Sequence, residues 1–270
     1  MNVKKALPSI ASFLLLSCSA FALPWNHPAQ PTVVDLAQSE KKVYSQNGED
    51  GVLEKIFKTI GVTNKVYVEF GCDGGAESNT RYLREKRGWR GLLMDRTCEN
   101  SAINLRKAHI TAENCDSLFA TYKVPEKFDL LSIDIDYNDF YIWKAIKQYY
   151  PRVVVIEYNA SFLATEDKIV LYNPNYLWDG SNYFGASILA YAKLGSAKGY
   201  TLVYAESNGV NLFFIRDDIL EGLKDKVVFK NQGNVNELYA PPRYGSGPNG
   251  GHPTDPLKRE FLPFLQAYTQ

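Results

Sequence analysis

The chain has 270 residues, of which 45% are hydrophobic and 22% charged, a composition typical of a globular protein with one large α/β domain or two small ones. Its 30 lysines and arginines balance 30 aspartates and glutamates. No net electrostatic field therefore favours nucleic acid or an anionic membrane, and we expect no nucleic-acid partner.

The first 22 residues have the order of a secretory signal peptide: two lysines, an apolar run at 10–16, and then small residues. The run is too short to span a bilayer comfortably, so no transmembrane span is expected in the mature chain. Cleavage after Ala22 would give an exported protein, periplasmic or secreted. The alternative is a lipoprotein box that ends in a lipid-anchored Cys18.

Three further segments follow this leader. Residues 23–43 are proline-rich and predict an irregular tether. Residues 44–219 carry the regular pattern of a domain. Residues 220–270 become rich in proline and glycine and predict a C-terminal extension, packed on the domain or trailing from it.

Helical and strand patterns alternate through the domain. The expected strands are 66–70, 91–95, 109–113, 128–135, 152–157, and a closing hairpin of 199–205 and 211–216. The expected helices are 47–60, 79–86, 98–108, 138–149 and 183–197. Long apolar strands separated by helices predict a doubly wound, Rossmann-like α/β fold, with a mostly parallel sheet covered by helices on both faces.

The strand at 66–70 runs directly into an acidic, glycine-rich turn at 69–75. Such a turn lets a ligand approach the backbone closely at the start of the next helix. The dinucleotide motif G-x-G-x-x-G is missing, because Asp73 and Ala76 stand where glycines are needed. An acidic turn repels a pyrophosphate and attracts an ammonium or a hydroxyl group, which favours S-adenosylmethionine. Asp95 ends the next strand, where an acid binds ribose hydroxyls.

Oxygen-bearing side chains follow the ends of two neighbouring strands: Asp134, Asp136, Glu157 and Asn159. Such a set suits Mg²⁺, which would lower the pKa of a substrate hydroxyl. The favoured alternative holds no metal: Asn138 and Asp139 cap a helix, Asp136 is solvated, and Asp134 alone belongs to the site. The three histidines are scattered, which gives no support to a histidine-based hydrolase or a zinc site.

The turn motif Glu69–Gly74 resembles the first motif of class I S-adenosylmethionine-dependent methyltransferases. The wider pattern, over about residues 44–216, resembles the FkbM-like methyltransferase family. Its matching segments are Ser45–Asp50, Glu69–Gly74, Ser78–Thr80, Asp134–Asp136 and Pro151–Glu157. The resemblance implies a seven-stranded sheet with an antiparallel last strand. The chain departs from many relatives at Tyr137, where they carry glycine.

The resemblance also implies roles for individual residues. Glu69 and Gly71 would hold the methionine part of the cofactor, Asp95 the ribose, and Asp116 would lie near the adenine. The cofactor-binding candidates are Glu69, Gly71, Asp73, Gly74, Asp95, Asp116 and Gln46. Gln46 either covers the cofactor or belongs only to the start of its helix. Asp134 and Glu157 are the catalytic candidates, since either carboxylate can accept the acceptor's proton.

The leading hypothesis is an S-adenosylmethionine-dependent O-methyltransferase that acts on a small hydroxylated acceptor, such as a sugar or glycan. The signal sequence conflicts with it, because the cofactor is expected chiefly in the cytosol. The alternative is an exported, non-catalytic binding or interaction protein that retains a methyltransferase-like scaffold.

Overall fold

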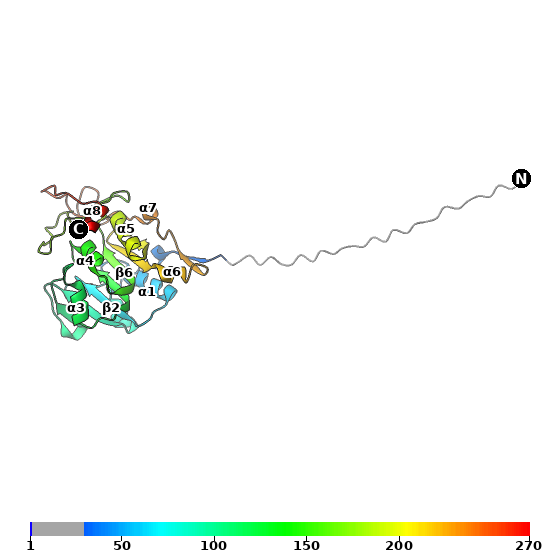
Figure 1. Cartoon of the computed structure of the whole chain (residues 1–270), viewed down its shortest axis with the longest axis horizontal. Helices are drawn as coiled ribbons and strands as arrows, with labels where there is room; N and C mark the ends of the chain where they lie inside the picture. The colour runs from blue at the N-terminus through cyan, green and yellow to red at the C-terminus, as the bar shows by residue number, and fades with distance from the viewer. Residues whose placement is uncertain (2–29) are drawn as a thin grey trace.

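The computed structural model of the protein describes Met1 and residues 30–270 (Figure 1). The expected cleavage after Ala22 and the lipid anchor at Cys18 lie outside the described residues. Within those residues, no helix combines the length and the apolar character needed to cross a membrane.

A seven-stranded sheet forms the centre of the domain. Its strands lie in the order β4 (Leu105–Lys107), β3 (Arg90–Asp95), β2 (Val66–Phe70), β5 (Lys127–Ile133), β6 (Tyr150–Glu157), β8 (Asn211–Arg216) and β7 (Tyr200–Ala205). The pairs from β4 to β6 are parallel, whereas β8 is antiparallel to both of its neighbours. The predicted α/β class is confirmed, including the antiparallel last strand and the closing hairpin.

Helices cover both faces of the sheet. One face carries α1 (Glu49–Ile60) and α2 (Arg81–Arg87), and the other carries α3 (Cys115–Thr121), α4 (Asp139–Ala145) and α5 (Ile188–Lys198). Successive side chains of a strand point to opposite faces, so Tyr67 packs with α1 and α2 while Val68 packs in the core on the other side. Burial on both faces explains why the central strands are continuously apolar.

The segment between β3 and α3 differs from the sequence-based expectation. The helix expected at 98–108 is wrong: a single 3₁₀ turn, Ser101–Ile103, is followed by the short strand β4, and 109–113 is not a strand. Asn104 adopts a left-handed backbone conformation, with φ of +56°, which ends the turn. Its carbonyl accepts a hydrogen bond from the amide of Leu93 at 3.1 Å, which brings the chain onto the edge of the sheet.

The two terminal segments pack on the domain. β1 (Thr32–Val34) pairs in parallel with β9 (Val227–Phe229). Glu40 accepts hydrogen bonds from the backbone amide and the hydroxyl of Ser207, at 2.7 and 2.6 Å. Within the segment for which a tether was expected, Thr32–Val34 thus form a strand, and Val34 is buried in the domain core.

The C-terminal extension covers the domain instead of trailing from it. Lys144 of α4 donates a hydrogen bond to the carbonyl of Ala267 at 2.9 Å. The remaining short helices of the described chain are the 3₁₀ helix Leu36–Ser39, α6 (Asp217–Glu221), α7 (Val235–Leu238) and α8 (Phe264–Thr269). The segment between α7 and α8 reaches the carboxyl ends of the sheet strands, where the candidate site lies.

Candidate active site

The turn after β2 touches the turn after β5 at Gly71. Its φ is +65°, and a β-carbon at this position would lie 1.5 Å from the carbonyl oxygen of Asp134. Only glycine can occupy such a position, because every other residue brings a β-carbon into the neighbouring backbone. The glycine predicted from sequence is thus required by the contact between two strand ends, and the site is built around that contact.

Glu69 lines the site, but its carboxylate is already engaged. It accepts hydrogen bonds from the hydroxyl of Ser78 at 2.7 Å, from the amide of Asn79 at 2.7 Å, and from both the amide and the hydroxyl of Thr80. Burial raises the pKa of Glu69, and these hydrogen bonds oppose that rise. The side chain therefore fixes the segment that precedes α2, which makes it a positioning residue.

Asp95 is held rigidly at the end of β3, with only 5% of its surface exposed. One carboxylate oxygen accepts hydrogen bonds from the amide and hydroxyl of Thr97 and from the amide of Cys98, at 2.7, 2.8 and 3.1 Å. The other accepts from the amide of Asp73 at 3.0 Å. The carboxylate thus joins the end of β3 to the glycine-rich turn.

Two adjoining cavities meet at this turn, and Gly71, Asp73, Asp95, Asp136 and Trp178 line both. The larger cavity has a volume of about 280 Å³ and the smaller about 190 Å³. Seven carboxyl side chains line the larger one: Glu69, Asp73, Glu77, Asp95, Asp134, Asp136 and Glu157. No lysine or arginine is found among its lining residues in the described chain. The smaller cavity has apolar walls at Ile110, Ile135 and Leu177.

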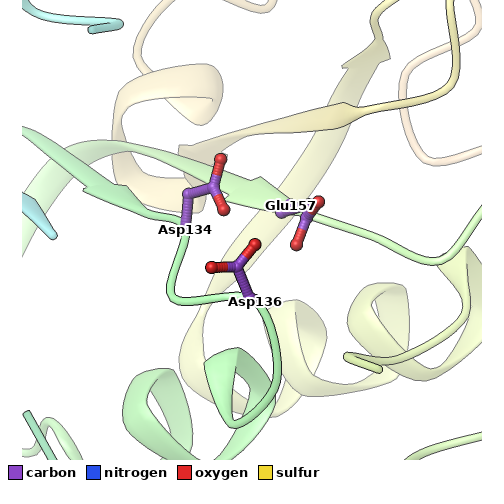
Figure 2. A group of neighbouring side chains, drawn as sticks. All are labelled: Asp134, Asp136 and Glu157. Atoms are coloured by element: carbon purple, nitrogen blue, oxygen red, sulfur yellow. The ribbon is translucent and has the colours of Figure 1, made fainter. Parts of the chain in front are cut away.

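Three of the acids form a compact group. Figure 2 shows the carboxyl groups of Asp134 and Asp136, from the loop after β5, turned toward that of Glu157 at the end of β6. One oxygen from each lies within 4.8 Å of the others. Burial and then the charge of Asp139 raise the pKa of Asp134, and burial followed by the charge of Asp134 raises the pKa of Glu157.

Asn138 is the N-cap of α4, as expected, but its side chain makes no capping hydrogen bond. Asp139 is fully buried and accepts a hydrogen bond from the amide of Ile135 at 2.8 Å, which closes the turn after β5. Burial raises its pKa to about 7. The side-chain amide of Asn138 donates to the carbonyl of Asn173 at 2.8 Å and so holds the long insertion at 159–182.

The side chain of Asn159, a metal-ligand candidate in the sequence, is hydrogen-bonded to the backbone through both its nitrogen and its oxygen. Its side-chain amide donates to the carbonyls of Asn182 and Phe184 at 2.8 and 3.0 Å. Its oxygen accepts from the amide of Ser161 at 3.2 Å. The side chain therefore helps to fold the insertion.

Of the remaining cofactor candidates, Gln46, Gly74 and Asp116, only the first lines a cavity. Gln46 lines the larger cavity. Gly74 lies in the glycine-rich turn but lines neither cavity. Asp116 also lines neither, because it lies in the first turn of α3, where its carboxylate accepts from the amide of Lys147 at 3.4 Å. Ile110 reaches the cavity instead, since the chain before α3 is irregular.

Several lining residues were not found from sequence: Phe184, Asn211 and His252 in the larger cavity, and Ile110 and Leu177 in the smaller. The ring centroid of His252 lies 4.4 Å from that of Trp178 and 5.5 Å from that of Phe184. Burial lowers the pKa of His252. The one available signal was the pair Gly250-Gly251, both with positive φ, which bends the extension immediately before this histidine.

Tyr137, the position at which the chain departs from its suggested relatives, helps to form the smaller cavity. Its hydroxyl donates to the carbonyl of Leu171 at 2.9 Å, and its ring centroid lies 4.0 Å from that of Tyr176. Tyr137 therefore attaches the insertion to the turn after β5. Within the insertion, Trp178 lines both cavities, whereas Tyr172 bonds to Glu113 away from them.

No protein-family model and no curated protein matches the sequence. The chain is similar to several solved structures. One is a SAM-dependent methyltransferase from Aquifex aeolicus, with 11% identity, a TM-score of 0.31, and coverage of 60% of this chain and 88% of that one. Another is human N-acetylserotonin methyltransferase in complex with SAM, with 10% identity, a TM-score of 0.33, and coverage of 61% and 54%.

A third is the mitomycin 7-O-methyltransferase MmcR, with 15% identity, a TM-score of 0.30, and coverage of 62% of this chain and 54% of that one. The chain thus spans about half the length of the last two structures. At these identities and TM-scores, the likeness carries no argument about activity, which has to come from the site itself.

Proposed function

We propose that the protein is an S-adenosylmethionine-dependent O-methyltransferase acting on a small hydroxylated or sugar-like acceptor. The observation that carries the proposal is the position of Asp95. Its carboxylate is fixed by four hydrogen bonds at the junction of an acidic cavity and a cavity with apolar walls. A nucleoside with a positively charged tail needs three environments in a row: an apolar wall for its base, a hydrogen-bond acceptor such as Asp95 for its ribose, and acidic groups for its tail.

The cofactor fits the two cavities in one direction. The adenine occupies the smaller cavity against Ile110 and Leu177, and the ribose hydroxyls bind Asp95. The methionine part then enters the larger cavity beside the Gly71 turn. Its sulfonium and ammonium groups are both positive, so the carboxylates of that cavity attract them.

The reaction is an in-line displacement at the methyl carbon. A lone pair of the acceptor oxygen forms the new C–O bond while the C–S bond breaks, which leaves S-adenosylhomocysteine and a methyl ether. The hydroxyl proton passes to Asp134 or Glu157 in the larger cavity. The protein otherwise contributes positioning and a fixed electrostatic environment.

The acceptor lies on the side of the larger cavity formed by Trp178, Phe184 and His252. Trp178 comes from the insertion, Phe184 from the segment between the insertion and α5, and His252 from the C-terminal extension. Aromatic rings suit the apolar face of a sugar-like molecule, and the neighbouring carboxylates suit its hydroxyl groups. This wall supports a small, hydroxylated acceptor.

Calorimetry with S-adenosylmethionine and S-adenosylhomocysteine tests the cofactor site. We expect saturable binding, and Asp95→Ala should weaken it by about 1–3 kcal/mol because a buried ligand hydroxyl loses its partner. Asp116→Ala is the matched control and should leave the affinity unchanged. Absence of binding at millimolar ligand, or equal affinity in wild type and Asp95→Ala, would refute the proposed site. Binding without transfer to any hydroxylated acceptor would favour the non-catalytic alternative.

Export is part of the proposal. It rests on the lysines, apolar run and small residues of the first 22 positions. Mass spectrometry of the native N-terminus should find Leu23 as the first residue. A diacylglycerol-modified Cys18 would instead establish the lipoprotein alternative, and an intact Met1 would refute export by this signal.

A further inference from the structure

The larger cavity carries far more negative than positive charge. Seven carboxyl side chains line it, and no lysine or arginine does so within the described residues. S-adenosylmethionine would bring only one net positive charge, since its ammonium and carboxylate cancel and its sulfonium remains. Closely spaced carboxylates repel one another unless protons or cations compensate them.

Three of these carboxylates have the spacing of a ligand set. One oxygen each from Asp134, Asp136 and Glu157 can be chosen so that all lie within 4.8 Å of one another. Oxygen ligands stand about 2.0–2.6 Å from Mg²⁺ or Ca²⁺, so ligands of one ion lie within about 5 Å of each other. The three side chains come from the ends of two adjacent strands and face a common point (Figure 2).

A second observation comes from the neighbouring strand. Asn211 of β8 is the register partner of Glu157, and it lines the same cavity with only 2% of its surface exposed. Its side-chain amide donates to Glu49 at 2.9 Å, but its oxygen Oδ1 has no hydrogen-bond partner within the described residues. Oε2 of Glu157 is likewise buried without a partner there.

Buried oxygen acceptors normally have partners, because leaving them unpaired costs free energy. An ionised carboxylate only accepts hydrogen bonds, so the acids of this cavity satisfy Oδ1 of Asn211 only where one of them carries a proton. A bound cation, with the water molecules it retains, supplies the missing partner to an amide oxygen and to carboxylates together. The unpaired amide oxygen therefore points to a positive ligand in the acidic cavity.

We propose that Asp134, Asp136 and Glu157 bind one hard divalent cation, with Oδ1 of Asn211 as a ligand from β8 or as a partner of a cation-bound water. Mg²⁺, Mn²⁺ and Ca²⁺ are the ions that prefer such an all-oxygen set. No histidine or cysteine of the described residues joins the group, which disfavours zinc. Two of these ligands, Asp134 and Glu157, are also the proton acceptors of the proposed transfer, but cation binding can be measured by itself because the ligands are all protein side chains.

Mn²⁺ is the probe for this site, because its free form can be counted by electron paramagnetic resonance. The full-length protein is titrated with Mn²⁺ in the absence of S-adenosylmethionine. We expect one equivalent to bind and to be displaced by Mg²⁺ or Ca²⁺. Absence of saturable binding up to millimolar Mn²⁺ would overturn the proposal, while leaving the cofactor site to be judged separately by calorimetry.

Asp136→Asn tests the ligand assignment. Asp136 has a φ of +65°, a conformation that asparagine also adopts readily, so the variant should fold. Its affinity for Mn²⁺ should fall by at least about tenfold, because removing a direct ligand costs no less than removing a residue that supports one. Glu77→Gln is the matched control: it also lines the cavity but stands outside the group of three, so its affinity should stay within about twofold of wild type.

A second variant, Glu157→Gln, keeps the proposal testable if circular dichroism shows that Asp136→Asn does not fold. It should lose Mn²⁺ affinity to a similar extent, whereas Asn211→Asp should retain or increase it by adding a negative oxygen ligand. Equal weakening by Glu77→Gln and Glu157→Gln would show diffuse attraction of cations to the cavity and would contradict a defined site.

Discussion

The carbonyl oxygen of Asp134 lies against Gly71 so closely that a β-carbon on Gly71 would stand 1.5 Å from it. This contact joins the end of β5, the central strand of the sheet, to the end of its neighbour β2. The glycine-rich turn after β2 and the turn after β5 therefore pack together as one unit. A change at either residue is expected to move both cavities, since both are lined by Gly71.

Gly71→Ala should destabilise the protein severely, by about 3 kcal/mol or more, because it combines a backbone clash with an unfavourable φ. Gly74→Ala is the matched control in the same turn, since a β-carbon there meets no atom within 4 Å. Thermal and urea unfolding of the two variants measure the difference. Similar midpoints for both would contradict the packing between the two turns.

Glu69→Ala should lower the free energy of unfolding by about 2–4 kcal/mol. The substitution leaves the amides of Asn79 and Thr80 without their acceptor, and unpaired buried donors are costly. Glu77→Ala, an exposed acid a few residues later, should change stability by less than about 0.5 kcal/mol. Urea titration compares them, and equal stability of the two variants would show that Glu69 does not hold the segment before α2.

Glu206 should make stability depend on pH. Its side chain is fully buried at the start of the closing hairpin turn, directly after β7, and burial, reinforced by the charges of Glu49 and Glu40, raises its pKa to about 7. The folded state therefore holds a proton that the unfolded state releases near its ordinary pKa of 4.5. This contribution is complete below about pH 4.5 and is lost as the pH rises to about 7.

Glu206→Gln should remove this loss of stability at higher pH. The variant should gain stability relative to wild type by about 2–3 kcal/mol at pH 8. It should gain little at pH 4.5, where the wild-type carboxyl is protonated in the folded state and about half protonated in the unfolded state. Urea unfolding at the two pH values measures this difference. Parallel pH dependence of the two proteins would show that Glu206 is not protonated in the folded state.

Much of the fold follows from local pattern. The bounds of β2 and β8 were predicted without error, because short apolar runs bounded by turn residues determine them. The convergence of Asp134 and Glu157 was also predictable, since parallel strands present their carboxyl ends at one edge of the sheet. These features depend on neighbours in sequence and on general topology.

The rest depends on contacts between distant segments. The left-handed conformation at Asn104, which replaces an expected helix by β4, depends on hydrogen bonding to the adjacent strand. His252 reaches the larger cavity only because the C-terminal extension folds back over it. Asn159 has the residue type of a metal ligand, yet the carbonyls of Asn182 and Phe184 engage it. Residue type and spacing alone do not determine such long-range partners.

The most direct measurement of the central claim is a crystal structure of the protein with S-adenosylhomocysteine. The account predicts that the ribose hydroxyls bind Asp95 and that the adenine lies against Ile110 and Leu177 in the smaller cavity. The homocysteine part should then lie in the larger cavity beside Gly71. A ligand bound outside these cavities, or no ligand in crystals grown at millimolar concentration, would contradict the account.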